Sequence, residues 1–301
     1  SENELKGISK GFCKAIFNYI GTDIDIPAPD MGTNSQVMDW MVEQYQSMNP
    51  CNKLDCGMFT GKSVACGGSL GRNEATGYGI MLCVRELLKK KNINPKGLKY
   101  IIQGFGNVGS NTATLLSDMG MICIGLGDHS GYYLKEDGFN VHDAQNHVIK
   151  NGSFEGYQTG SKVSKEEFFC LDCDMVIPAA LELQINKEIA EKMKCSFIVE
   201  AANGPTNLDA DKILNDRNIV VVPDILANSG GVVVSYYEWL QNKRSDYWNK
   251  EKVNKKLSIQ MTQIFNNVYE YSQKKSISLR SSAYVLSLRN IEQVYKNKSF
   301  F

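Results

Sequence analysis

A glycine-rich turn after a short apolar run constrains the fold of this chain more than any other feature. The apolar run is Tyr-Ile-Ile at residues 100–102, and the sequence GFGNVG follows at residues 104–109 and opens a helical segment. Gly104 permits a tight turn, Gly106 lets the backbone approach a pyrophosphate, and Gly109 lets a helix pack closely on a strand. A helix that starts there offers free N–H groups and the positive end of its dipole to phosphates. The pattern therefore predicts a strand–turn–helix unit that binds a dinucleotide.

An acidic residue, Asp128, ends the next apolar run, about 20 residues after the last glycine of the turn, where the dinucleotide fingerprint requires one. Its carboxylate can accept hydrogen bonds from the hydroxyls of the adenosine ribose, and it repels a 2′-phosphate. No lysine or arginine follows at once, since His129 and Ser130 come next. We therefore expect NAD as the cofactor in preference to NADP, with the use of NADP left open.

Further short apolar runs alternate with helical segments after the turn, at residues 121–124, 175–177, 197–199 and 219–222. Nearly continuous apolar strands of this kind suit a parallel sheet with helices on both faces. We therefore expect an α/β fold with a doubly wound, Rossmann-type dinucleotide domain. Apolar periodicity also predicts helices at 5–18, from Thr33 or Asn34 to about 48, at 73–91, and through most of the chain after Asn228.

The composition is that of an ordinary globular protein, with 301 residues, 43% of them hydrophobic and 22% charged. A formal net charge of zero argues against a general attraction to nucleic acid or anionic membranes. The apolar runs are too short to span a bilayer, and the first residues lack the apolar core of a signal peptide. We therefore expect a cytoplasmic protein without a nucleic-acid or membrane partner.

The nine cysteines do not predict a disulfide framework, because their number is odd and the chain is large. Cys83, Cys123 and Cys195 lie inside apolar runs, so we interpret them as small buried hydrophobes in a reducing compartment. Cys170 and Cys173 form a CxxC pair without a second ligand pair or a thioredoxin-like context. A structural role is therefore favoured over a redox or zinc site, and no metal is expected.

Five ordered motifs make the comparison with a known family specific. They are PAPDMGT at residues 27–33, GGSLGRNEATG at 67–77, GFGNVG at 104–109, EAANGPT at 200–206 and NSGGVVVSYYEW at 228–239. Together they resemble the motifs of hexameric glutamate dehydrogenases, in the family of glutamate, leucine, phenylalanine and valine dehydrogenases.

The domains that this resemblance implies are the C-terminal part of a substrate and oligomerisation domain at 1–69, a Rossmann-type domain at 70–225, and C-terminal helices that return to the first domain at 226–301.

The resemblance also implies roles for single residues. Asp30 would be the catalytic carboxylate that moves a proton to and from the reacting nitrogen, although an aspartate in a Pro-rich turn is by itself usually structural. Val232 would line the substrate pocket, and the Ser235 hydroxyl would donate to the side-chain carboxylate of glutamate. Arg72 could equally be a structural ion-pair partner. The expected cofactor-binding residues are Arg72, Thr76, Gly104, Phe105, Gly106, Asn107, Val108, Gly109, Asp128, Ala179, Ala180, Asn203 and Asn228.

The implied reaction is the reversible oxidative deamination of L-glutamate. The α-hydrogen leaves as hydride to the nicotinamide, and the iminium product adds water and loses ammonia to give 2-oxoglutarate. Glutamate would bind in a cleft between domains, in a homo-hexamer. Two alternatives stay open: a leucine-, valine- or phenylalanine-type dehydrogenase, whose PAPD and ANGPT segments differ, and a catalytically silent dinucleotide-binding subunit, which fold alone does not exclude.

The start of the chain carries a further expectation. In the family that it resembles, a Gly-rich segment with the catalytic lysine and other substrate-binding lysines lies upstream of the PAPD stretch. Residues 1–29 contain no such segment, and Lys6, Lys10 and Lys14 suit the solvated side of a helix. We therefore expect residues 1–301 to be part of a longer enzyme, to bind a dinucleotide, and to be inefficient alone in glutamate turnover.

Overall fold

The structure is a computed structural model that describes residues 1–49 and 56–298, and its chain forms two compact units. The first unit comprises Ser1–Ala75 and Gly231–Leu257, and the second comprises Thr76–Gly230 and Ser258–Phe301. This grouping differs from the expected one, in which all of 226–301 returned to the first domain. The later residues join the second unit because they pack on it: Arg85 Nη2, for example, donates to Thr262 Oγ1 at 3.0 Å.

The first unit is built on helices α1 (Glu2–Ile16), α2 (Ser35–Met48) and α10 (Gly230–Arg244), with 3₁₀ turns at Phe17–Tyr19 and Val64–Cys66. The predicted helices at 5–18 and 34–48 are confirmed, and α2 begins where the Asn34 side chain accepts from the N–H of Val37. Residues 50–55, which come after α2, lie outside the described residues. Buried side chains of α1, of the residue after the first 3₁₀ turn, of α2 and of the segment before Thr60 form one core: Cys13, Ile20, Val37, Met38, Trp40, Met41, Val42, Tyr45, Met58 and Phe59.

The second unit contains a seven-stranded sheet in the order β4-β3-β2-β1-β5-β6-β7. Five strands are parallel: β1 (Lys99–Gln103), β2 (Ile122–Asp128), β5 (Met175–Pro178), β6 (Phe197–Val199) and β7 (Val220–Val222). All five were predicted from their apolar runs. The antiparallel strands β3 (Gly131–Leu134) and β4 (Ser161–Val163) at one edge were not, because they are short and their exposed faces interrupt any apolar run.

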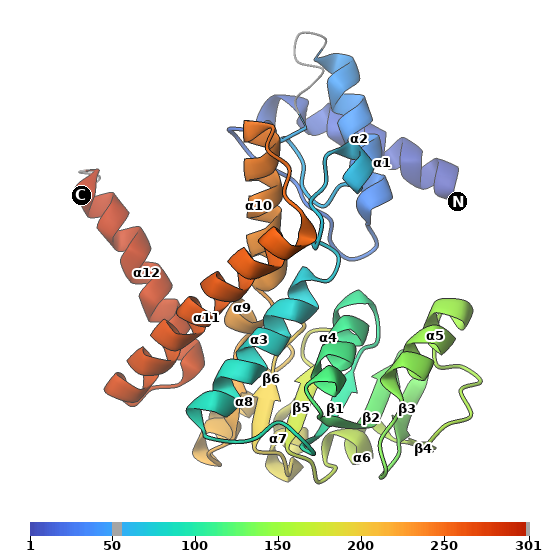
Figure 1. Cartoon of the computed structure of the whole chain (residues 1–301), viewed down its shortest axis with the longest axis vertical. Helices are drawn as coiled ribbons and strands as arrows, with labels where there is room; N and C mark the ends of the chain where they lie inside the picture. Colours follow the sequence, from blue (N-terminus) through green and yellow to red (C-terminus); the bar gives the residue numbers. More distant parts are fainter. Residues whose placement is uncertain (50–55, 299–301) are drawn as a thin grey trace. The chain divides into compact units, whose positions relative to one another are not determined.

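Helices cover both faces of this sheet, as Figure 1 shows, so the predicted doubly wound α/β fold is confirmed. Side chains of α6 (Lys165–Phe169), α7 (Lys187–Lys192) and α8 (Leu208–Asp216) share one core with the strands. On the other face lie α3 (Ala75–Lys90), α4 (Asn107–Asp118) and α5 (Val141–Asn151). There the buried Tyr100 hydroxyl of β1 donates to the carbonyl of Ala113 in α4 at 2.9 Å.

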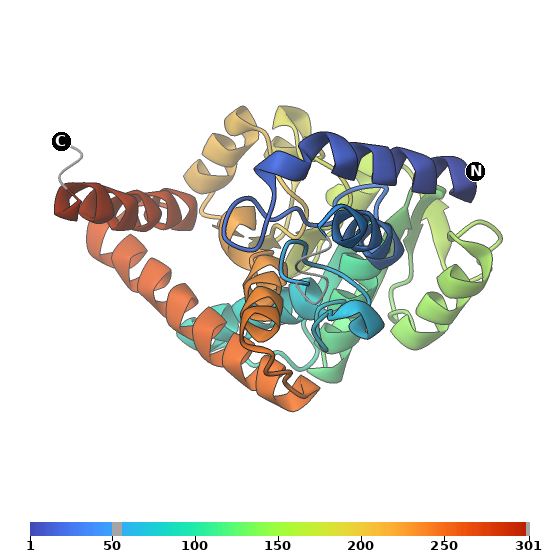
Figure 2. The same ribbon diagram turned by 90° about the horizontal axis from the view of Figure 1, so that it is seen from above.

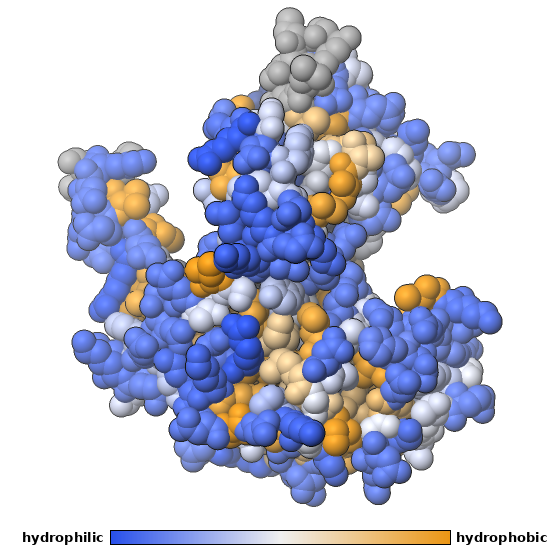
Figure 3. Space-filling model, viewed as in Figure 1, coloured by the Kyte–Doolittle hydropathy of each residue, from blue (hydrophilic) through white to orange (hydrophobic). Residues whose placement is uncertain are grey.

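The chain ends in helices α11 (Lys250–Lys275) and α12 (Leu279–Asn297), which follow the short α9 (Asp224–Ala227) and α10 and lead into each other in Figure 2. Figure 3 shows hydrophobic surface along α12, where Leu288, Ile291 and Val294 are exposed. Among residues 1–49 and 56–298, no helix has the length and apolar character that a bilayer crossing would need.

The cysteines that the sequence placed in apolar runs are confirmed as buried residues. Cys83, Cys123 and Cys195 are at most 6% exposed, and burial raises the pKa of each thiol to about 12. Cys173 of the CxxC pair is also buried, its Sγ lies 3.6 Å from the Met175 carbonyl oxygen, and burial raises its pKa. These thiols stay protonated at neutral pH and act as packing groups.

Candidate active site

The glycine turn lies between the ends of three parallel strands. Gly104 follows β1 with φ of +91°, and its N–H donates to the carbonyl of Gly127 in β2 at 2.7 Å. On its other side, a Cβ at this position would stand 2.6 Å from the carbonyl carbon and oxygen of Ala179. Both the left-handed backbone and the lack of space therefore require glycine here.

The other two glycines of the turn have opposite surroundings. A Cβ on Gly109 would stand 1.8 Å from the carbonyl oxygen of Gly104, so the start of α4 packs directly on the turn. A Cβ on Gly106 would meet nothing within 4 Å. Gly106 is also the N-cap of α4 and makes no side-chain capping hydrogen bond. The start of α4 therefore presents open space beside backbone N–H groups, which is what a pyrophosphate needs.

The other residues of the turn divide into buried and exposed ones. Phe105 is 3% exposed, and its ring packs against Phe154 with centroids 5.0 Å apart. Its side chain is therefore part of the core, and only its backbone belongs to the turn. Asn107 is exposed and Val108 half-buried in the first turn of α4, where the Asn111 amide donates to the Asn107 side-chain oxygen.

Asp128 ends β2 beside the turn, as predicted, but its carboxylate already has partners. Oδ1 accepts from the backbone N–H of Ser130 at 2.7 Å and from its hydroxyl at 2.6 Å, and Oδ2 accepts from the N–H of Phe154 at 2.8 Å. A carboxylate has about four acceptor positions, so roughly one stays available to a ribose hydroxyl. The negative charge itself is not neutralised by any of these donors.

Small residues and a threonine border the same region of the second unit. Ala179 follows β5, with its N–H donating to Gln103 at 2.6 Å, and Ala180 is exposed. Thr76 is half-buried at the start of α3. The next residue, Gly77, lies so near α4 that a Cβ there would stand 2.9 Å from the Cβ of Asn111.

Two predicted site residues that are far apart in sequence meet directly. Asn228, at the end of α9, donates from its Nδ2 to the Oδ1 of Asn203 at 2.7 Å. Asn203 is exposed in the turn that follows β6, and Asn228 is half-buried. The pair stands beyond the carboxyl ends of the parallel strands, where open α/β sheets bind their ligands.

In the first unit the structure brings together Arg72 and Ser235. The Arg72 Nε donates to the Ser235 Oγ at 2.8 Å, which leaves the serine O–H free to donate elsewhere. Burial lowers the pKa of Arg72, and the nearby charge of Glu238 opposes this effect. The sequence placed Arg72 among the cofactor-binding residues, whereas its partner is the serine expected at the substrate.

The three consecutive valines before Ser235 differ in exposure. Val233 is 9% exposed and Val234 is fully buried, whereas Val232 is 67% exposed. Val233 and Val234 are therefore core residues, whereas the exposed Val232 is able to line a binding surface.

Asp30 lies exposed in a tight turn of the Pro-rich segment. Its Oδ1 accepts from the N–H of Met31 at 2.8 Å, and its N–H donates to the Thr33 hydroxyl at 2.7 Å. The preceding Pro29 packs on Gly61, where an added Cβ would stand only 2.4 Å from the proline ring. The segment around residue 60 therefore packs against the turn that carries Asp30.

That supporting segment depends on a buried ion pair that sequence reasoning missed. Lys62 Nζ contacts Glu238 Oε1 at 2.7 Å, and both side chains are completely buried. Glu238 also accepts from the backbone N–H groups of Gly61 and Lys62, at 3.1 and 3.3 Å. The available signal was Glu238 inside the motif at 228–239, but Lys62 lies outside all five motifs and nothing in the sequence pairs the two residues.

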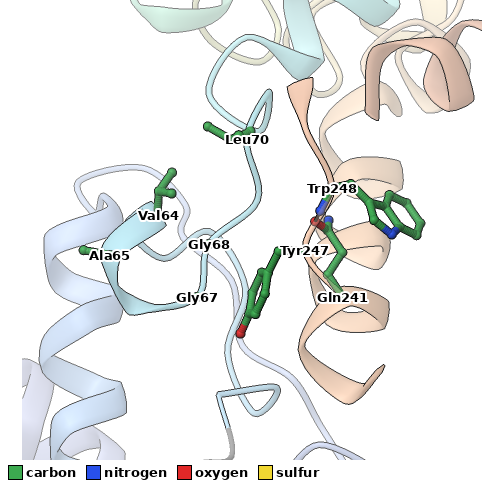
Figure 4. Close-up of a pocket in the computed structure, with 8 residues that line it drawn as sticks. All are labelled: Val64, Ala65, Gly67, Gly68, Leu70, Gln241, Tyr247 and Trp248. Atoms are coloured by element: carbon green, nitrogen blue, oxygen red, sulfur yellow. Dashed lines mark hydrogen bonds between the residues drawn. The ribbon is translucent and has the colours of Figure 1, made fainter. Parts of the chain in front are cut away.

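A cavity of about 370 Å³ in the first unit lies near these residues without containing them (Figure 4). The residues that line it are Val64, Ala65, Gly67, Gly68, Leu70, Gln241, Tyr247 and Trp248. Gln241 has its own partners, since its Nε2 donates to the Ser69 hydroxyl and its Oε1 accepts from the N–H of Trp248. The cavity therefore offers mainly apolar walls, and none of its lining residues was predicted to bind substrate or cofactor.

Comparison with known proteins decides the family. Residues 67–298 match the family model described as glutamate/leucine/phenylalanine/valine dehydrogenase, and residues 1–47 match the dimerisation domain of the same family. The chain belongs to the glutamate dehydrogenases of this family. The NAD-specific glutamate dehydrogenase of Staphylococcus aureus is 38% identical over 303 residues, with 100% of this chain and 72% of that protein covered. The cryptic catabolic NAD-specific glutamate dehydrogenase of Bacillus subtilis is 40% identical over 296 residues, with 97% of this chain and 68% of that protein covered.

Solved glutamate dehydrogenases have the same fold. The hetero-hexameric enzyme from Thermus thermophilus superposes with a TM-score of 0.93 at 28% identity, over 99% of this chain and 70% of that one. The enzyme from Peptoniphilus asaccharolyticus gives a TM-score of 0.84 at 35% identity, over 100% of this chain and 72% of that one. The resemblance that the five motifs predicted is therefore confirmed for this dehydrogenase.

Proposed function

We propose that this dehydrogenase catalyses the reversible oxidative deamination of L-glutamate to 2-oxoglutarate and ammonia, with NAD as the hydride acceptor. The likeness to two NAD-specific glutamate dehydrogenases over at least 97% of the chain is the observation that carries this proposal. The open space at Gly106 and the uncapped start of α4 support it, because they suit a dinucleotide phosphate.

On the cofactor side, the chain would bind and orient the dinucleotide. The N–H groups at the start of α4 would hold the pyrophosphate, and the remaining acceptor position of Asp128 would hold the adenosine ribose. Asn203 and Asn228 would hold the nicotinamide ribose and carboxamide, with Thr76 at the nicotinamide amide. NAD, when bound, supplies the electrophilic carbon that accepts the hydride. The charge of Asp128 favours NAD over NADP in this arrangement.

On the substrate side, the first unit would bind the amino acid. The Ser235 hydroxyl donates to the distal carboxylate of glutamate, since its oxygen already accepts from Arg72. Arg72 adds positive charge beside the same carboxylate, and Val232 lines the pocket. Asp30 accepts a proton from the reacting ammonium group and returns one during the reverse reaction.

The proposal includes assembly into a homo-hexamer in the cytoplasm. The match of residues 1–47 to a dimerisation domain supports self-association. The exposed apolar side chains of α12 support it too, because solvent-facing apolar stripes are typical of contact surfaces.

The direct test measures NADH formation by the full-length protein with glutamate, leucine, valine or phenylalanine as substrate. We expect kcat/KM for glutamate to exceed that for each of the others by at least about 100-fold, since Ser235 and Arg72 suit a second carboxylate. Equal or higher kcat/KM for leucine would show an apolar-substrate dehydrogenase. Tight NADH binding without oxidation of any amino acid would show a silent binding subunit.

A further inference from the structure

One arginine near the start of α12 contacts three carboxylates of the second unit. Arg280 Nη2 lies 2.7 Å from Glu200 and 3.0 Å from Asp211, and its Nη1 lies 3.3 Å from Asp224. The three acids come from the end of β6, from α8 and from the start of α9. The Glu200 side chain is completely buried, and that of Arg280 is 20% exposed. A buried carboxylate of this kind needs a cation as its partner.

Two of these carboxylates also hold the backbone on either side of the predicted nicotinamide site. Glu200 Oε2 accepts from the N–H of Asp224 at 2.9 Å. Asp224 Oδ2 accepts from the N–H of Gly204 at 2.8 Å, and its Oδ1 accepts from the N–H of Ile225 at 2.8 Å. Asp224 therefore joins the turn after β6 to the first turn of α9.

The Asn203–Asn228 pair lies on these two segments, the turn after β6 and helix α9. Asn203 directly precedes Gly204. The backbone N–H of Gly204 donates to the Asp224 carboxylate. Asn228 donates its own N–H to the Asp224 carbonyl at 3.0 Å, and its side chain donates to Asn203 at 2.7 Å. Both asparagines are thus anchored through Asp224, which shares the positive charge of Arg280 with Glu200 and Asp211.

We propose that Arg280 is a positioning residue for the nicotinamide end of the cofactor, acting through Glu200 and Asp224 on the Asn203–Asn228 pair. This rests on the proposed function, which assigns that pair to the nicotinamide. Without the guanidinium, three carboxylates would face one another without a cation, and their repulsion would loosen the turn after β6. A lysine would keep one charge but has no planar fork to bridge several carboxylates.

The test compares two ligands on the full-length protein and on an Arg280→Met variant. NADH carries the nicotinamide and its ribose, whereas ADP carries only the adenosine and phosphates that the turn at residues 104–109 and Asp128 would bind. We expect the variant to bind NADH about tenfold more weakly, the scale of reordering one or two side chains on binding. ADP affinity should stay within about twofold of wild type. Arg289→Met is the matched control, because Arg289 lies on the same helix and contacts the ring of Tyr271.

A second variant separates positioning from stability. Glu200→Gln combined with Arg280→Met removes the buried charge together with its partner, so the melting temperature should recover toward wild type. NADH affinity should remain low, because Asp224 is still without its cation. Should Arg280→Met be recovered unfolded, Arg280→Lys serves in the same comparison, with the same direction expected.

Several outcomes would overturn the proposal. Equal losses of NADH and ADP affinity, or recovery of NADH affinity together with the melting temperature, would show a purely structural arginine. An unchanged NADH affinity in a folded Arg280→Met variant would do the same. Failure of the wild-type protein to bind NADH at all would instead contradict the proposed function on which this inference rests.

Discussion

At the scale of single residues, two glycines of one turn differ in what a methyl group would meet. Gly109→Ala should destabilise the fold by at least about 2 kcal/mol, because its Cβ would stand 1.8 Å from a backbone oxygen. This reverses the usual sign, since alanine in a helix is normally about 1 kcal/mol better than glycine. Urea denaturation of the variant measures the change, and a Gly109→Ala protein as stable as wild type would contradict the packing described here.

Gly106→Ala should behave in the opposite way. The Gly106 backbone is not left-handed, and a Cβ there would meet nothing within 4 Å. The substitution should therefore lower the free energy of unfolding by no more than about 1 kcal/mol, the scale of an N-cap change. A methyl group there would occupy the place of the pyrophosphate, so NADH affinity should fall at least about tenfold. Titration of NADH fluorescence checks this. Undiminished NADH binding would place the phosphates elsewhere.

Ser235 offers a prediction on the substrate side. Ser235→Ala should weaken glutamate binding by about 1–2 kcal/mol, the scale of one hydrogen bond to a charged group. The Arg72 Nε also loses its acceptor, which acts in the same direction. Steady-state kinetics should show a higher KM for glutamate with NADH affinity nearly unchanged. The reverse pattern, weaker NADH and an unchanged glutamate KM, would remove Ser235 from the substrate site.

Asp128 offers a prediction on cofactor choice. Asp128→Asn keeps the size of the side chain but removes the charge that repels a 2′-phosphate. The ratio of kcat/KM for NAD to that for NADP should fall about tenfold, equivalent to about 1.4 kcal/mol. Asp128→Ser should narrow the preference too, with an added loss of stability because Ser130 and Phe154 lose their acceptor. A wild-type protein that uses NADP at least as well as NAD would contradict this account of Asp128.

At the scale of elements, the buried Lys62–Glu238 pair joins helix α10 to the segment around residue 60, which packs against Pro29. Lys62→Met alone should destabilise the protein by about 3–5 kcal/mol, because it leaves a buried carboxylate without a cation. Adding Glu238→Gln should recover a large part of that loss. Chemical denaturation of the single and double variants measures both effects.

The control for this pair lies on the same helix. Lys243 pairs with Asp23 in an exposed position, so Lys243→Met should change stability by no more than about 1 kcal/mol. If Lys62→Met costs as little as Lys243→Met, the loop does not depend on the buried pair.

The elements themselves were largely predictable, because local rules decide them. Apolar runs gave β1, β2, β5, β6 and β7, and the cap at Asn34 gave the start of α2. Strands β3 and β4 were not predicted, because an edge hairpin needs little apolar sequence. The turn that joins β2 to β3 depends on side-chain bonds of Asp128, which a pattern search assigns only to the cofactor.

At the scale of the whole molecule, contacts between distant segments were not predictable. Arg280 and Glu200 lie 80 residues apart, and Lys62 and Glu238 lie 176 apart. Hydrophobic periodicity predicts which face of a helix is buried, but it does not predict which distant charged residues will pair with each other. The same reason explains why residues 258–301 were expected with the first unit rather than with the second.

In the proposed reaction, hydride passes from the α-carbon of glutamate to NAD, and an isotope on that carbon follows the transfer. The full-length protein is supplied with NAD and either glutamate or leucine carrying deuterium on the α-carbon, and the NADH formed is analysed by mass spectrometry. We predict NADH that carries one deuterium from labelled glutamate and little or no NADH from labelled leucine. NADH without deuterium, or deuterium delivered more efficiently from leucine, would contradict the proposed function.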